Sequence, residues 1–336
     1  MPFSASRQFR CMCRSTWLTA RGAHLTFTAG SLVTLCLAAT SPLANAEPTK
    51  VAAAVPIVLP ALPPIELKLV AKLEPGPAKE NSGIVKSRSH EDLFWMHNDS
   101  GDEPRIYPIH RNGKNYTNER YPNEAGVLIG GAINVDWEDI TVDADGNVIV
   151  ADLGNNDNDR RDLVLYYLDE PSSTAGRTTF KKKIFVKYPD QHEFPAAKDR
   201  FNFDCEAVFT VGNTVHLLSK HRSDSRTTHY RLDHPQLEST NTLTKLADFD
   251  LHGQAVGADC SADGKRLVVI SYEGIWLFKR DTEEQSFFDG HISWGPDGPE
   301  REIETVCFAD EETLLLGDEE LAELYEVPVK ALTEIR

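Results

Sequence analysis

Apolar and polar residues alternate in short runs along most of the chain, and tight-turn residues separate the runs. The stretch from Asp136 to Asn156 (DWEDITVDADGNVIVADLGNN) shows this pattern most clearly. An apolar run, a turn signal at Asp145-Gly146 and a second apolar run at Val148–Val150 together predict a β-hairpin. The pattern continues from Ile65 onward with hardly any helical periodicity, so residues 65–336 are predicted to form one all-β domain.

The predicted hairpin recurs along the chain at spacings of 46 to 68 residues. The segments that align with Trp137-Glu138-Asp139-Ile140 are Asn81-Ser82-Gly83-Ile84, Cys205-Glu206-Ala207-Val208, Ile303-Glu304-Thr305-Val306 and, more weakly, Gly257-Ala258-Asp259. After each of them we expect a second strand, at 93–96, 148–150, 215–218, 267–270 and 313–316, and a third, at 105–109, 163–168, 228–232, 275–279 and 323–327. A less regular fourth strand completes each unit, and four-stranded repeats of this length are typical of a β-propeller.

Five blades are favoured, and a sixth is possible if the irregular region 116–134 contains one. A solenoid or a β-sandwich is the alternative fold. The last repeat has no clear fourth strand before the chain ends, whereas a strand-like segment at 66–73 (ELKLVAKL) precedes the first repeat. We therefore expect this N-terminal strand to close the ring.

The first 46 residues have the pattern of an export signal, with four arginines, no acid, an apolar run at 32–39 and small residues at 41–46. An Ala/Pro-rich linker at 47–64 follows. The apolar run is short for a transmembrane helix, so the protein is predicted to be periplasmic or secreted, without a stable membrane anchor. Removal of this signal takes the formal net charge from −17 to −21. This charge argues against a nucleic-acid or anionic-membrane partner.

Three of the six cysteines lie in the signal, which leaves Cys205, Cys260 and Cys307. At least one of these thiols must be unpaired, and the sequence leaves open whether the other two form a disulfide or all three are buried and free. No Cys/His spacing typical of a zinc site is present.

In a propeller the first strand of each blade starts on the same rim on which the second strand ends, so residues at these two positions converge on one mouth. A spacing of fourteen residues pairs Glu138 with Asp152, Glu206 with Lys220 and Glu304 with Asp318, and Ser82 is paired with Asp99. Clustered carboxylates repel each other unless a cation or protons compensate. We expect a divalent cation, most plausibly calcium, with three glutamates as ligands and three aspartates in support: Glu138, Glu206, Glu304, Asp99, Asp152 and Asp318. The alternatives are that these acids cap turns or share protons.

Three further residues are candidates for contact with a substrate at this mouth: Lys220, Arg222 and Tyr272. The two cations could hold an anionic group or offset the acids. His97 and His221 are weak candidates for proton transfer, because a lone loop histidine is more often a solvated side chain. No G-x-S-x-G, H-E-x-x-H or phosphate-binding glycine motif is present.

The combination of HNDSGD at 97–102, DWEDI at 136–140, DLGNN at 152–156 and a nearby arginine resembles a group of exported bacterial β-propellers. More distantly, the chain is similar to the esterase-like propellers found with phytases and to calcium-dependent lactonase and phosphotriesterase propellers. The resemblance is sharpest over residues 97–162. It implies a divalent cation near the propeller axis and, in some members, hydrolysis of esters or lactones.

Two functions follow as hypotheses. The first is a metal-assisted hydrolase of esters, lactones or phosphoesters. The second is a non-catalytic propeller that uses the same rim to bind a small molecule, a sugar, a peptide or a partner protein. Fold alone does not decide between them.

Overall fold

The computed structural model describes residues 57–336, except for residues 78, 119, 121, 123, 299 and 300. The predicted signal at 1–46 and the first part of the predicted linker lie outside the described residues. The described part of the chain consists almost entirely of strands, with three short 3₁₀ segments at Lys198–Arg200, Phe287–Asp289 and Val329–Ala331.

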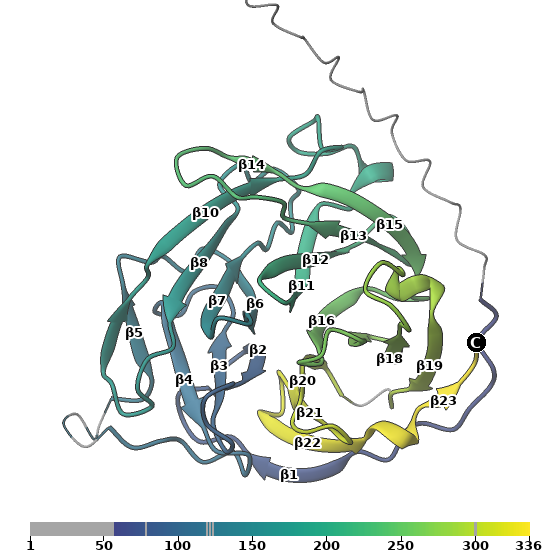
Figure 1. Cartoon of the computed structure of the whole chain (residues 1–336). Helices are drawn as coiled ribbons and strands as arrows, with labels where there is room; N and C mark the ends of the chain where they lie inside the picture. The colour runs from purple at the N-terminus through teal and green to yellow at the C-terminus, as the bar shows by residue number, and fades with distance from the viewer. Residues whose placement is uncertain (1–56, 78, 119, 121, 123, 299–300) are drawn as a thin grey trace, which may run out of the picture. The chain divides into compact units, whose positions relative to one another are not determined.

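The described strands form five sheets, each built outward from one inner strand (Figure 1). The inner strands are β2 (Asn81–Lys86), β6 (Trp137–Val142), β11 (Asp204–Val211), β16 (Ala255–Cys260) and β20 (Ile303–Phe308). The second strands are β3 (Phe94–Asn98), β7 (Asn147–Asp152), β12 (Thr214–Lys220), β17 (Arg266–Ser271) and β21 (Thr313–Asp318). The third strands are β4 (Arg105–Ile109), β8 (Val164–Asp169), β13 (Arg226–Arg231), β18 (Gly274–Lys279) and β22 (Glu323–Pro328).

A fourth strand completes each of the five blades. These strands are β5 (Val127–Gly130), β10 (Lys182–Lys187), β15 (Thr244–Asp250), β19 (His291–Pro296) and β1 (Lys68–Lys72), and the edge strands β9 (Arg177–Thr179), β14 (Asn241–Thr242) and β23 (Thr333–Glu334) extend three of the blades. The predicted β-propeller is confirmed, with five blades. The region 116–134 holds no sixth blade among its described residues, because it contributes β5 to the first blade.

The ring is closed by the N-terminal strand, as predicted. β1 pairs antiparallel with β22, and the register matches Lys68 with Glu326 and Lys72 with Glu323. The last blade therefore combines three C-terminal strands with one strand from the beginning of the described chain. This pairing supplies backbone partners to strands that would otherwise be open edges.

Apolar side chains fill the spaces between neighbouring blades. One cluster joins Ile149 and Leu165 of the second blade to Val208 and Leu217 of the third. Four tryptophans are buried, with exposed fractions of 0 to 6 %: Trp95, Trp137, Trp276 and Trp294. The inner and second strands are buried along most of their length, because each blade packs both of its faces against its neighbours.

Every inner strand carries a β-bulge at its second or third residue. The bulged residues are Ser82, Glu138, Glu206, Val256 and Glu304, each of which lies between two paired residues without a partner of its own. A bulge inserts one extra residue and re-aims the side chain there. The predicted pairs are therefore shifted. Asp152 pairs with Trp137 and Asp318 with Ile303, one residue before the predicted glutamate, and Lys220 pairs with Asp204, two residues before Glu206.

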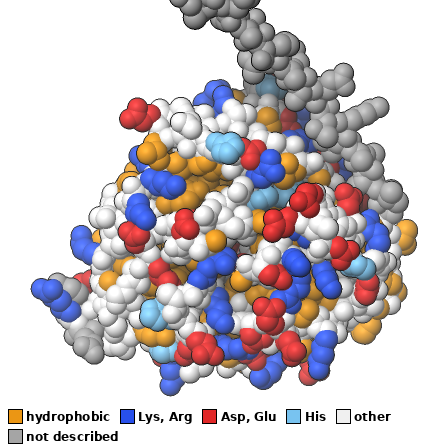
Figure 2. Space-filling model, in the orientation of Figure 1, with side chains coloured by type: hydrophobic (Ala, Val, Ile, Leu, Met, Phe, Trp, Pro, Cys, Tyr) orange, Lys and Arg blue, Asp and Glu red, His pale blue; other side chains and the backbone are white. Residues whose placement is uncertain are grey.

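Cys205, Cys260 and Cys307 are all buried and unpaired, so the structure contains the three free thiols that the sequence left open. On the face of the molecule seen in Figure 2, acidic and basic side chains are interspersed. Among the described residues, no helix is both long enough and apolar enough to span a membrane.

Candidate functional site

Three groups of carboxylates lie close together on the rim at which the inner strands begin. The groups are Asp99, Asp136 and Glu138; Glu138, Asp204 and Glu206; and Glu302, Glu304 and Glu319. Within each group, one oxygen from each residue lies within 4.8 Å of the others. We call these eight residues the acidic mouth.

The acidic mouth is built by one local rule that three blades share. The bulged glutamate at the start of the inner strand is preceded two residues earlier by a second acid. The pairs are Asp136 and Glu138, Asp204 and Glu206, and Glu302 and Glu304. In each pair the earlier acid lies just before or at the start of the inner strand and the glutamate lies at its bulge, so both carboxylates are at the same rim. This acid-x-acid pattern is visible in the sequence, but it was not part of our sequence-based prediction.

Glu138 occupies the centre of the site, because it belongs to two of the three groups. Its side chain is buried, with an exposed fraction of 5 %. The Ser82 hydroxyl donates to the Glu138 carbonyl oxygen at 3.0 Å and lies 3.5 Å from its Oε2. Burial and then the neighbouring Glu206 raise the pKa of Glu138 well above its usual value. Glu138 is thus the carboxylate for which a neutralising partner matters most.

Gly154, in the loop after β7, makes room for these carboxylates. A Cβ atom at this position would collide with Glu138 Oε1 and Asp136 Oδ2. The Gly154 N–H also donates to the backbone carbonyl of Asp136 at 3.1 Å. The glycine of the DLGNN motif therefore allows the loop backbone to lie directly against the two acids, and any side chain would fill the space into which their oxygens point.

The three residues predicted to contact a substrate all line the acidic mouth. Lys220 Nζ donates to Glu206 Oε2 and, at 2.9 Å, to the Tyr272 hydroxyl, which in turn donates to Glu304 Oε1 at 2.8 Å. Arg222 Nη2 lies 2.7 Å from Asp204 Oδ2 and 3.5 Å from Glu206 Oε1. Lys220, Tyr272 and Glu304 thus form a continuous polar bridge from the third blade to the fifth.

The positive charge at this rim does not match the negative charge. Eight carboxylates face two paired cations, and the second group contributes three acids that are all buried. Burial, followed by the charges of Asp99 and Asp204, raises the pKa of Asp136 to about 6. Burial, followed by Glu304, raises the pKa of Glu319. The surplus of negative charge is what a bound cation or bound protons would neutralise.

Asp152 and Asp318, predicted to support the metal, have the contacts of loop caps. Asp152 lies 2.8 Å from Arg160 Nη2 and accepts the N–H groups of Val135 and Asp136. Asp318 accepts the N–H of Leu321 at 2.7 Å and that of Glu302 at 3.3 Å. In the last blade, the residue that joins the carboxylate group is Glu319, one position further along. The one-residue difference is the consequence of the bulge.

The two candidate histidines point away from the acidic mouth. His97 is fully buried, its Nδ1 lies 3.0 Å from the Asn98 carbonyl oxygen, and burial lowers its pKa to about 4. His221 lies between β12 and β13, with Nδ1 at 2.7 Å from Asp224 and Nε2 at 3.2 Å from the Thr228 hydroxyl. Neither histidine hydrogen-bonds to a carboxylate of the acidic mouth.

No protein-family model and no curated protein matches the sequence. Among solved structures, the chain is similar to hydrazine synthase of Kuenenia stuttgartiensis, with 9% identity, a TM-score of 0.41 and coverage of 75% of this chain and 72% of that one. Virginiamycin B lyase of Staphylococcus aureus is similar with 13% identity, a TM-score of 0.38 and coverage of 76% of this chain and 68% of that one. The β-propeller domain of Cps50 (Swd1) of Myceliophteria thermophila is similar with 9% identity, a TM-score of 0.41 and coverage of 79% of this chain and 100% of that one. These similarities are too distant to carry an argument about activity.

The raised pKa of Asp136 predicts how the stability of the metal-free protein depends on pH. Between pH 3.8, the usual value of this carboxyl, and about pH 6, folded Asp136 holds more proton than unfolded Asp136. The contribution of Asp136 to stability therefore falls as pH rises through this window and is constant above it. Asp136→Asn should remove this contribution. In chelator, the free energy of unfolding of the variant minus that of wild type should therefore increase as pH rises from 4 to 6. Denaturant unfolding at a series of pH values measures the difference, and a difference independent of pH would contradict the prediction.

Proposed function

We propose that the acidic mouth binds a divalent cation, calcium in an exported protein, and that the protein is a metal-dependent hydrolase of esters, lactones or phosphoesters. The observation that carries the proposal is a cluster of five carboxylates, from three consecutive blades, with Glu138 at its centre. They are Asp99, Asp136, Glu138, Asp204 and Glu206.

The donor set fits a hard cation. All candidate ligands are carboxylate oxygens, which calcium and magnesium prefer, and the flexible geometry of calcium tolerates an irregular arrangement. Glu138, Asp204 and Glu206 would hold the ion from adjacent inner strands, which are rigid elements of the fold. Asp99 and Asp136 would complete the negative charge around Glu138. Extracellular calcium sites can be weak, since the ion is abundant outside the cell.

The remaining residues of the mouth suit the hydrolysis of an anionic or polar ester. A divalent cation, when bound, polarises an ester or phosphoester oxygen and lowers the pKa of a bound water. Lys220 and Arg222 lie beside Glu206, where their charges would orient an anionic group of the substrate. Asp136, which is half-buried beside Glu138, would accept a proton from a water bound at the site.

A second function is a cation-dependent binding propeller without turnover. The observation in its favour is that, among the described residues, neither His97 nor His221 hydrogen-bonds to a carboxylate of the acidic mouth. In this case the same rim would capture a small molecule, a sugar or a peptide, and calcium would order the carboxylates that contact it. The polar bridge from Lys220 through Tyr272 to Glu304 would form part of the binding surface.

Metal-dependent turnover separates the two functions. We expect the purified protein to hydrolyse at least one member of a panel of lactones, carboxylate esters and phosphoesters in calcium. The activity should be lost in chelator and in Glu138→Gln. The matched control is Glu284→Gln, at an exposed glutamate between β18 and β19, which should retain the activity. A folded protein that binds calcium but turns over no member of the panel would contradict the hydrolase and support the binding propeller.

A further inference from the structure

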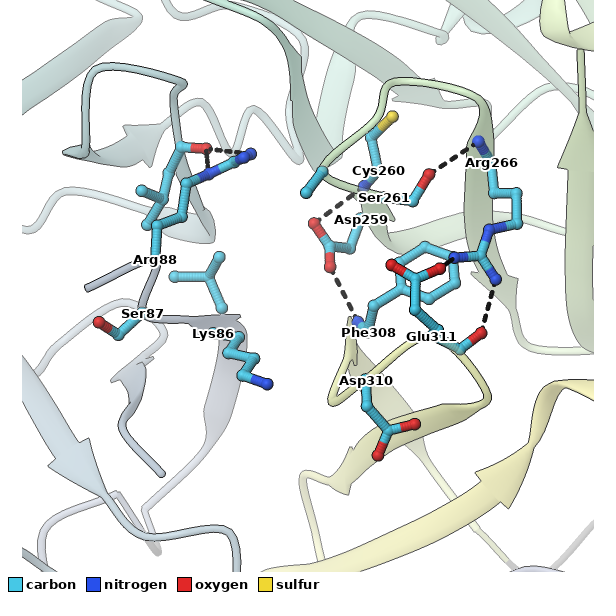
Figure 3. Close-up of a pocket in the computed structure, with 13 residues that line it drawn as sticks. Lys86, Ser87, Arg88, Asp259, Cys260, Ser261, Arg266, Phe308, Asp310 and Glu311 are labelled. Carbon is cyan, nitrogen blue, oxygen red and sulfur yellow. Dashed lines mark hydrogen bonds and ion pairs between the residues drawn. The ribbon is translucent and has the colours of Figure 1, made fainter. Parts of the chain in front are cut away.

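A second cavity lies at the opposite rim of the propeller, where the inner strands end. Its volume is about 540 Å³, within the range of sites for small organic ligands. The lining comes from the ends of β2, β6, β16 and β20 and the loops that follow them (Figure 3). The lining residues are Val85, Lys86, Ser87, Arg88, Val142, Asp259, Cys260, Ser261, Ala262, Arg266, Phe308, Asp310 and Glu311. The acidic mouth contributes none of them.

Two cations of this cavity are held by backbone carbonyls instead of carboxylates. Arg88 donates from Nε and Nη2 to the carbonyl oxygen of Val142, at 3.1 and 3.0 Å. Lys86 Nζ donates to the carbonyl oxygen of Ala309 at 2.5 Å. Neither cation forms an ion pair with a described acid, so both keep hydrogen-bond donors at the wall of the cavity. In a chain of net charge −17, two unpaired cations in one cavity stand out.

The acids that line the cavity already have partners. Asp259 accepts the N–H of Cys260 at 2.8 Å and that of Phe308 at 2.9 Å. Asp310 is ion-paired with Arg111 at 2.7 Å. Glu311 is ion-paired with Arg266. Lys86 and Arg88, on the other side of the cavity, form no ion pair with a described acid, and Arg88 acts on Asp259 only through its charge.

The walls between the charged groups are apolar. Val85 and Val142 are buried residues near the ends of β2 and β6, and Phe308 ends β20. The Arg266 guanidinium lies 5.1 Å from the centre of the Phe308 ring, which fixes both side chains at one wall. Figure 3 shows Lys86, Ser87 and Arg88 on one side of the cavity and Ser261, Arg266 and Phe308 on the other. A ligand between them would meet positive charge on one side and apolar surface around it.

We propose that this cavity binds a small organic anion, a carboxylate or a phosphate monoester carried on an apolar body. Lys86 and Arg88 would contact the anionic group, since charge-assisted hydrogen bonds to such groups are stronger than neutral ones. Val85, Val142 and Phe308 would contact the apolar body. The cavity is independent of the cation site, because none of its residues belongs to the acidic mouth.

Calorimetric titration of the folded protein in chelator tests the proposal, with phenyl phosphate and phenylacetate as anionic probes and benzyl alcohol as the neutral one. At least one anionic probe should bind, more weakly at higher salt, and benzyl alcohol should bind at least tenfold more weakly. The comparison of the two anionic probes shows whether phosphate or carboxylate is preferred.

Lys86→Gln and Arg88→Gln should each weaken the binding of the anionic probe about tenfold or more, as expected for loss of one charged hydrogen-bond donor. Lys187→Gln, at an exposed lysine that ends β10, is the matched control and should bind as wild type. Thermal unfolding verifies that each variant is folded. If Arg88→Gln does not fold, the binding measured for Lys86→Gln alone tests the proposal. The proposal would be overturned if neither anionic probe bound, or if wild type and Lys86→Gln bound the anionic probe equally. It would also be overturned if benzyl alcohol bound as tightly as the anionic probe.

Discussion

Glu138→Gln is expected to lower the affinity for calcium about 100-fold or more, since even residues behind the ligands of a metal site change affinity 10- to 100-fold. The physical reason is that Glu138 belongs to both carboxylate groups on its side of the mouth, so one substitution removes a charge from each. Calorimetric titration with calcium measures the change. An affinity equal to that of wild type would contradict the role of Glu138.

The same variant should change stability in two directions. In chelator, Glu138→Gln should unfold at a higher temperature than wild type, because it removes a carboxyl whose ionisation is opposed by burial and by the charges of Glu206 and Asp99. In calcium at one hundred times the dissociation constant, wild type should gain about 2.7 kcal/mol and the variant almost none. Glu284→Gln again serves as the control, and equal calcium-induced shifts in all three proteins would contradict the expectation.

Gly154→Ala is expected to abolish calcium binding and to destabilise the protein by about 1–3 kcal/mol, the usual cost of an overpacked site. The added methyl group would collide with Glu138 Oε1 and Asp136 Oδ2, so the loop or both carboxylates must move. The matched control is Gly130→Ala, where the nearest heavy atoms to the new Cβ lie at 3.4 and 3.5 Å. Denaturant unfolding and calorimetry measure the two effects. Normal calcium binding by Gly154→Ala would contradict the account of the loop.

Much of the fold could be predicted from the sequence, because strand periodicity and turn residues make the repeat recognisable. The third strands were predicted to within two residues, and one of them, β4 at Arg105–Ile109, without error. Closure by the N-terminal strand followed from the missing fourth strand of the last repeat. These features depend on local patterns that every blade shares.

The register could not be predicted, since it depends on bulges and on turns of unequal length. In the third blade, Val211 pairs with Thr214 across two turn residues, whereas in the second Val142 pairs with Val148 across five. Counting fourteen residues from Glu206 therefore gave Lys220, which lies at the mouth. Counting fourteen residues from Glu304 gave Asp318, whereas Glu319 is the residue whose carboxylate joins the mouth. The acids that precede the bulges, among them Asp204, could have been found from the acid-x-acid pattern.

The orientation of the histidines also could not be predicted. His97 begins a polar motif but lies within the buried strand β3, and its ring packs edge-on against Trp137 at 5.7 Å. His221 directly follows Lys220, but its side chain points toward Asp224 and Thr228. Adjacent residues on a strand point to opposite sides, so a shift of one position decides which side chain reaches the mouth.

The most direct test of the central claim is a crystal structure of the protein soaked in calcium. We predict a peak of density, with anomalous signal from the ion, between the carboxylates of Glu138, Asp204 and Glu206. Its oxygen distances should be about 2.3–2.6 Å. A well-ordered mouth with no such density at saturating calcium would contradict the account.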